Sequence, residues 1–121
     1  MVSAAVSAQD RRDAEALYES GLARFEAGDA EGAMRDWQRA LESFPGHRES
    51  RERLCAEHLT RGLAAFSRGA LEEAILSWET AVRLDPEDSR ATGYLQRARE
   101  QLARSDEIRE EQVAPQPERS R

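Results

Sequence analysis

The sequence predicts an all-α fold in which about five helices form antiparallel helix-turn-helix repeats. Ten identities recur at a spacing of 41 residues within the 25 positions from 21 to 45. Apolar residues follow spacings of three and four, which is typical of helices, and glycine or proline separates these stretches. The recurring pairs are Gly21/Gly62, Leu22/Leu63, Ala23/Ala64, Phe25/Phe66, Gly28/Gly69, Glu31/Glu72, Ala33/Ala74, Trp37/Trp78, Ala40/Ala81 and Pro45/Pro86.

The first unit, residues 14–47, contains two predicted helices. Gly28 ends the first of them and Asp29 starts the second. Pro45 ends the second helix, because proline disfavours helical geometry in the residue before it. The apolar faces are Tyr18, Gly21, Leu22 and Phe25 in the first helix, and Ala33, Trp37, Ala40, Leu41 and Phe44 in the second.

The second unit, residues 55–88, repeats this plan. Gly69 separates its two helices, and Asp85-Pro86 ends the second. Residues 48–57 contain no helix breaker, so they should extend the third helix backward by about two turns. The apolar faces are Leu59, Gly62, Leu63 and Phe66, and then Ala74, Ile75, Trp78, Ala81, Val82 and Leu84.

A fifth helix, residues 89–104, should close the stack. Asp88 or Ser89 can cap its start. Stacked helical repeats leave an apolar face at each end, and a terminal helix with a polar outer side covers it. Together the units and this helix make a domain over residues 13–104, after a flexible N-terminus at 1–12 and before a charged, disordered tail at 105–121. The face toward the stack is Ala91, Tyr94, Leu95, Ala98 and Leu102.

The two units and the closing helix resemble tetratricopeptide repeats, which are short α-solenoids of helix pairs. The resemblance covers about two-thirds of the chain, although the period of 41 exceeds the family's typical period of about 34. It implies packing roles for the small, aromatic and terminating residues. These structural positions are Gly21, Ala33, Trp37, Ala40 and Pro45 in the first unit, and Gly62, Ala74, Trp78, Ala81 and Pro86 in the second.

In that family the concave face of the first helices binds peptides or helices of partner proteins. Carried onto this chain, the face is apolar, with glutamates at its rim, which favours an amphipathic helix or an apolar peptide. It lacks the Lys, Asn and Arg that family members use to clamp a C-terminal carboxylate. Phenylalanines at this helical spacing are more often core residues than partner contacts, which applies to Phe25 and Phe66. The candidate partner-binding residues are Tyr18, Leu22, Phe25, Leu59, Leu63 and Phe66, and the rim is Glu15, Glu19, Glu26 and Glu57.

Catalytic and metal-binding interpretations find little support in the sequence. No nucleotide-binding, hydrolase or zinc-protease motif is present, so we expect no enzyme and no cofactor. His47, Cys55 and His58 lack the short paired spacings of zinc ligands, so we expect no metal. Cys55 stands where the first unit has Ala14, and His58 stands where it has Leu17, which makes both of them packing residues.

Charge and hydropathy narrow the class of partner. The net charge is −6 with both signs interspersed, which excludes binding to nucleic acid through a basic surface. No apolar run is long enough for membrane insertion. We therefore expect an adaptor or scaffold that binds another protein. The alternatives are a self-associating structural subunit of a larger assembly, which makes a homo-oligomer possible, or a periplasmic envelope-assembly factor.

The start of the sequence bears on localisation. Residues 1–10 lack a basic start and a long apolar stretch, which predicts a cytoplasmic protein. Val6-Ser7-Ala8 also resembles the small-residue end of a secretory signal, which is the basis of the periplasmic alternative.

Overall fold

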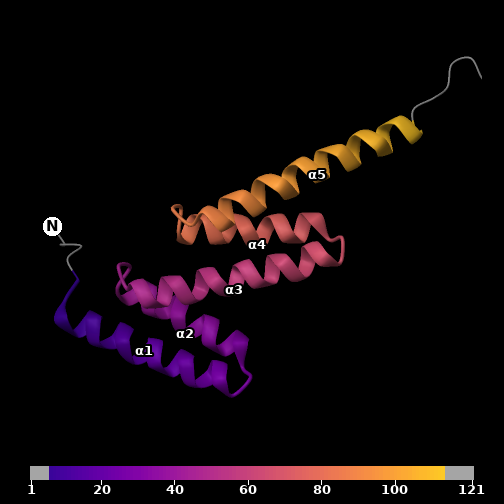
Figure 1. Ribbon diagram of the computed structural model, residues 1–121. Helices are drawn as coiled ribbons and strands as arrows, with labels where there is room; N and C mark the ends of the chain where they lie inside the picture. The colour runs from indigo at the N-terminus through magenta and orange to yellow at the C-terminus, as the bar shows by residue number, and fades with distance from the viewer. Residues whose placement is uncertain (1–5, 114–121) are drawn as a thin grey trace, which may run out of the picture.

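The computed structural model describes residues 6–113, and within this range it contains five helices and no strand (Figure 1). The prediction of an all-α helical repeat fold is confirmed. The third helix also begins two turns early, at Arg48, as the sequence predicts. In chain order the helices are α1 (Ala8–Glu26), α2 (Ala30–Ser43), α3 (Arg48–Ser67), α4 (Leu71–Leu84) and α5 (Ser89–Val113).

The N-terminal boundary of the domain differs from the predicted one. Helix α1 starts at Ala8, so residues 8–12 are helical rather than flexible. Ser7 causes the earlier start, because its Oγ accepts the backbone N–H of Asp10 at 3.0 Å and the Asp10 carboxylate accepts the N–H of Ser7 at 3.1 Å. Residues 1–5, also predicted to be flexible, lie outside the described residues.

The C-terminal boundary differs as well. Helix α5 continues past residue 104 to Val113, so the prediction of disorder is wrong for residues 105–113. No glycine or proline interrupts this segment before Pro115, and its Arg, Glu and Gln residues are good helix formers. Arg109 also donates to Asp106 at 2.9 Å, one turn earlier. The rest of the predicted tail, residues 114–121, lies outside the described residues.

The same glycine turn joins the two helices of each unit. Gly28 has φ 89° and Gly69 has φ 79°, a left-handed conformation that favours glycine. Each glycine N–H donates at 3.0 Å to a carbonyl three residues earlier, that of Phe25 or Phe66. Figure 1 shows the result: α1, α3 and α5 run in one direction, and α2 and α4 return between them.

Each tryptophan locks the two helices of its own unit. Its Nε1–H donates at 3.2 Å to a main-chain carbonyl on the preceding helix, 19 residues earlier. A glycine lies beneath each ring, and a Cβ added there would overlap the indole. The matching sets are Trp37 with Tyr18 O and Gly21, and Trp78 with Leu59 O and Gly62.

The core consists of two clusters, one for each unit. Leu54 of α3 belongs to the first cluster, so α3 fills the space beside α2 as well as pairing with α4. Leu84 packs against both clusters and joins them. The first cluster is Ala33, Met34, Trp37 and Leu54, and the second is Cys55, Leu59, Ala65, Ala74, Trp78, Ala81, Ala91, Leu95 and Ala98.

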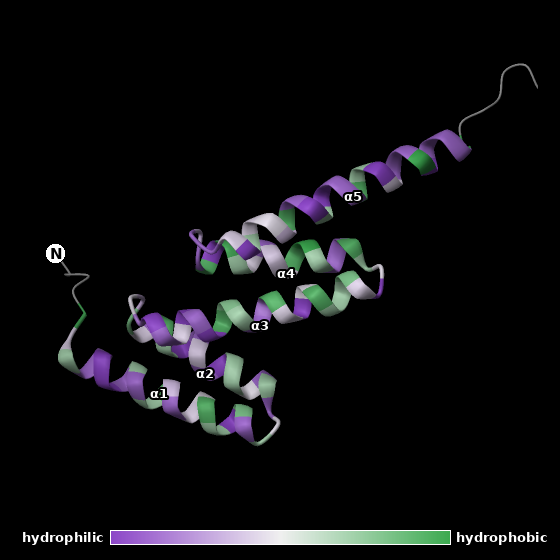
Figure 2. Ribbon diagram, in the orientation of Figure 1, coloured by the Kyte–Doolittle hydropathy of each residue, from purple (hydrophilic) through white to green (hydrophobic). Residues whose placement is uncertain are grey.

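Helix α5 covers the second unit and presents a polar surface beyond it. A shift of 41 residues places Gln96, Glu100 and Arg104 where α3 has Cys55, Leu59 and Leu63, and all three polar side chains are exposed. Figure 2 shows the hydrophilic colouring that dominates the projecting half of α5. A further helix would therefore find no apolar face there. Within residues 6–113, no helix combines the length and the apolar character needed to cross a membrane.

Candidate functional site

The candidate surface is the first-helix face, by which we mean the side of the stack formed by α1, α3 and α5. The six residues predicted to contact a partner lie on α1 and α3, but their exposure differs. Leu63 is the most open, with 46% of its surface exposed. The half-buried ones are Tyr18, Leu22, Phe25 and Phe66.

Leu59 does not belong to a binding surface. It is only 5% exposed, and it lies in the core cluster that includes Leu95 and Ala98 of α5. Its side chain is covered because α5 packs over this part of α3. Its main-chain carbonyl is also occupied, since it accepts the Nε1–H of Trp78. The prediction that Leu59 contacts a partner is therefore wrong.

An aromatic hollow lies between α3 and α5, beside Leu63. Its volume is about 60 Å³, and Leu63, Phe66, Trp78, Tyr94 and Arg97 line it. The ring of Trp78 lies 5.2 Å from that of Tyr94 and 5.7 Å from that of Phe66, between centroids. Pockets for small-molecule ligands usually measure about 300 Å³ or more. The hollow therefore has room for the tip of one side chain.

The corresponding place between α1 and α3 is filled by a cation. The guanidinium of Arg53 lies 4.9 Å from the ring centroid of Phe25 and 4.9 Å from that of Trp37. A shift of 41 residues places Arg53 on Tyr94. Each unit thus has its own Phe–Trp pair. Arg53 covers the pair of the first unit, whereas Tyr94 takes the equivalent position at the second, where Leu63 lies beside the hollow.

His47 connects α1 to α3. It caps α3, where its Nδ1 accepts the backbone N–H of Ser50 at 3.3 Å, and its Nε2 lies 3.1 Å from Oε1 of Glu15 on α1. A backbone N–H can only donate, so the ring proton lies on Nε2 and is donated to Glu15. The ring also lies 5.4 Å from that of Tyr18. His47 therefore holds the two first helices together at this end of the face.

A buried carboxylate in the first unit was not predicted from the sequence. Asp36 is buried between α1 and α2, where its Oδ2 accepts from Ser20 Oγ at 2.6 Å and from Arg24 Nε at 2.9 Å. Ser20 and Arg24 occupy positions at which tetratricopeptide repeats usually carry a leucine and an aromatic residue. Ser20 and Arg24 lie one turn apart on the same face of α1. These two departures from the family pattern were the available signal that a polar partner lies opposite this face.

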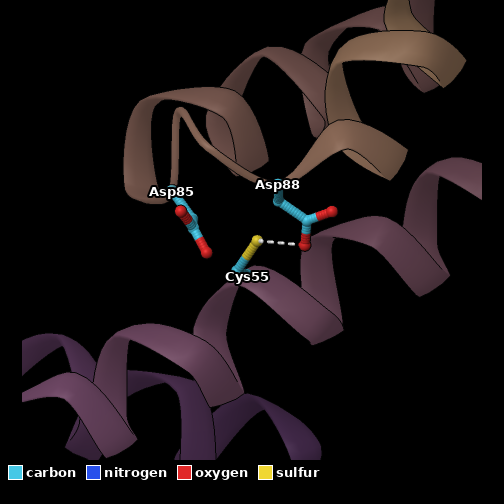
Figure 3. A group of neighbouring side chains, drawn as sticks. All are labelled: Cys55, Asp85 and Asp88. Carbon is cyan, nitrogen blue, oxygen red and sulfur yellow. Dashed lines mark hydrogen bonds between the residues drawn. The ribbon is translucent and has the colours of Figure 1, made fainter.

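Cys55, Asp85 and Asp88 form the one group of potential metal ligands found among the described residues (Figure 3). Their ligand atoms lie within 4.8 Å of one another. Burial, and then the charges of Asp88 and Asp85, raise the pKa of the Cys55 thiol to about 11. The thiol is therefore protonated at neutral pH, with its Sγ 3.6 Å from the carbonyl of Ala81 and 3.9 Å from Asp88.

The carboxylate of Asp88 already has hydrogen-bond partners within this chain. Its Oδ2 pairs with Arg90 Nη2 at 2.8 Å, and its Oδ1 caps α5 by accepting the backbone N–H of Arg90 at 2.9 Å. The hydrogen bonds from Arg90 lower the pKa of Asp88. This group thus acts as a hydrogen-bonded joint between α3 and the start of α5. His47 lies elsewhere, against Glu15, so the structure does not bring His47, Cys55 and His58 together.

Protonation of His58 should make the protein less stable at acid pH. Burial, and then the charges of Arg61 and Arg83, lower the pKa of His58 below its ordinary value of 6.5. As pH falls through this range, the unfolded chain takes up the proton first, so the free energy of unfolding decreases. Above it, His58 is neutral in both states and adds no pH dependence.

The variant His58→Leu, which copies Leu17 of the first unit, isolates this contribution. Its melting temperature should exceed that of the wild type by a larger margin at about pH 5 than at about pH 7.5. Thermal unfolding followed by circular dichroism in the two buffers measures both margins. Equal margins at the two pH values would contradict a lowered pKa for His58.

Comparison with known proteins gives a match to a repeat protein. The chain is 30% identical over 104 residues to tetratricopeptide repeat protein 14 of Mus musculus. The aligned region covers 86% of this chain and 14% of that protein, so the chain spans about a seventh of its relative's length. No family model matches the chain. Together with the five-helix architecture, the match is consistent with a tetratricopeptide-like fold.

Proposed function

We propose that this chain is a tetratricopeptide-like interaction module that binds a peptide or an amphipathic helix of a partner protein on its first-helix face. The observation that carries the proposal is the exposed Leu63 beside the aromatic hollow. Interfaces gain most of their affinity from a few anchors inserted into such well-packed places. The hollow is too small for a metabolite but suits one apolar side chain. No catalytic role is part of this proposal.

The variant Leu63→Arg should abolish this binding while the fold persists. We expect affinity for a peptide selected against the wild-type protein from a displayed library to fall about 30-fold or more, because the anchor site then carries a charge. Titration calorimetry measures the affinity, and far-ultraviolet circular dichroism confirms the fold. Nearly half of the surface of Leu63 is exposed, so the substitution should leave stability nearly unchanged.

Leu76→Arg is the matched control. Leu76 is 66% exposed on α4, and two residues along a helix place it on the side opposite Trp78 and therefore away from α3. The control should bind the selected peptide like the wild type. Equal losses in the two variants, or a loss in Leu76→Arg alone, would refute binding at the first-helix face.

Self-association is the competing proposal, because the projecting part of α5 exposes Ile108 and Val113. Five residues on a helix separate these side chains by about 140°, so they do not share one face. A stable helix–helix seam needs apolar residues repeated along one stripe. We therefore prefer the partner-binding proposal. A dimeric mass in light scattering that Ile108→Glu reduces to a monomer would favour self-association instead.

A further inference from the structure

We infer that the first-helix face selects the charges of its partner as well as its apolar anchor. The inferred partner is an amphipathic helix lying along α3, with carboxylates on its flank toward α5 and basic residues on its flank toward α1. This inference rests on the proposed function and specifies the chemistry of the partner. It follows from the charges on three stripes of the face, one from each helix.

The stripe on α5 is basic. Arg97 lines the aromatic hollow, and Arg104 lies two turns further along the same side of the helix. Neither arginine has an ion-pair partner within residues 6–113. Arg90 lies two turns before Arg97, and its charge is neutralised by Asp88 at 2.8 Å. One unpaired cation therefore lines the hollow and a second lies two turns further along α5, in a protein whose net charge is −6.

The stripe on α1 is acidic. Glu15, Glu19, Leu22 and Glu26 follow spacings of four, three and four, so they share one side of the helix. This side borders α3, because Glu15 contacts His47 at the start of α3, and Leu22 packs against the cluster that contains Leu54. Glu19 and Glu26 are exposed and form no ion pair with any residue from 6 to 113.

The stripe on α3, between these two, carries no charge from residue 56 to residue 67, whereas Glu49 and Glu52 continue the same spacing toward the start of the helix. It consists of exposed side chains at spacings of four, three and four. Beside residues 56–67 of α3, the face therefore changes from acidic at α1, through uncharged at α3, to basic at α5. The members of the α3 stripe are Ala56, Thr60, Leu63 and Ser67.

A helix is the occupant that matches all three stripes. It can direct an apolar stripe into the face and a separate polar stripe to each flank, because its side chains point in every direction around the axis. An extended peptide directs alternate side chains to only two sides. Opposite charges facing one another across an interface set the orientation of a partner and exclude partners of the wrong polarity.

Display selection with an unbiased library of short helical peptides tests the inference without knowledge of the natural partner. The baits are the wild type, Arg97→Glu/Arg104→Glu, Glu19→Arg/Glu26→Arg and Leu63→Arg, each checked for helix content. Wild-type selection should enrich peptides with an apolar anchor, Asp or Glu on one flank, and Lys or Arg on the other. The α5 variant should exchange the acidic preference for a basic one, and the α1 variant should exchange the basic preference for an acidic one.

Affinities of one enriched peptide give the size of the effect. Each charge-reversal variant should bind it about five- to tenfold more weakly at low salt, and the difference should shrink at high salt because these side chains are exposed. If the enriched peptides lose binding to Leu63→Arg but keep the same charge preferences on both reversal variants, the inferred polarity is wrong and the proposed function stands. If no peptide is enriched, or Leu63→Arg selects the same peptides, both are wrong.

Discussion

Replacing Trp78 with alanine should cost about 3–5 kcal/mol of the free energy of unfolding. Trp78 is 2% exposed, and its ring contacts Phe66 of α3 and Tyr94 of α5. The substitution leaves a cavity at the junction of three helices and removes the hydrogen bond to the carbonyl of Leu59. Domains of this size are usually stable by about 5–15 kcal/mol, so the substitution should remove a large part of the free energy of unfolding.

Denaturant unfolding followed by circular dichroism measures this loss, with Leu76→Ala as the control on the same helix. Leu76 is 66% exposed, so its truncation should change stability by no more than about 0.5 kcal/mol. Similar small losses in both variants would mean that Trp78 does not hold the second unit together.

Gly62→Ala should destabilise the protein by about 2–3 kcal/mol, although it adds only one methyl group and replaces glycine with the best helix former. The added Cβ would overlap the indole of Trp78, which its hydrogen bond and its aromatic neighbours hold in place. The ring or the helix pair must therefore move. The expected fall in melting temperature is about 10 °C or more for a domain of this size.

Gly93→Ala is the matched control, because it makes the same change within a helix. A Cβ at Gly93 meets no atom within 4 Å, so alanine there should stabilise the protein by about 0.5–1 kcal/mol. In the Trp78→Ala background, Gly62→Ala should lose most of its cost, since the overlapping ring is gone. Equal effects at Gly62 and Gly93 would contradict close packing of Trp78 on α3.

The arrangement of helices could be predicted from the sequence because the residues that recur are the residues that pack between helices. Trp37 and Trp78, with their glycines, mark the same contact twice. The ends of the helices were predicted less well. The cap from Ser7 and Asp10 is short and precedes the repeat, and the helical part of the predicted tail carries no apolar stripe to indicate it.

The binding surface could be predicted only in part, because exposure depends on contacts between units. Leu59 and Leu63 belong to the same apolar face of α3, but α5 covers the first and leaves the second open. Arg53 and Tyr94 occupy equivalent positions beside the Phe–Trp pairs of the two units. Whether each side chain covers its pair depends on how the helix that carries it packs. The buried Asp36 needed a contact between α1 and α2 that spacing alone does not specify.

Amide chemical-shift mapping with a selected peptide tests binding at the first-helix face most directly. Titration of the labelled wild-type protein should give the largest shifts around Leu63, Phe66, Tyr94 and Arg97, with smaller shifts along α1. The outer side of α4 around Leu76 should remain unchanged. Largest shifts around Leu76, or along the projecting end of α5 around Ile108, would place the partner on another surface and contradict the account.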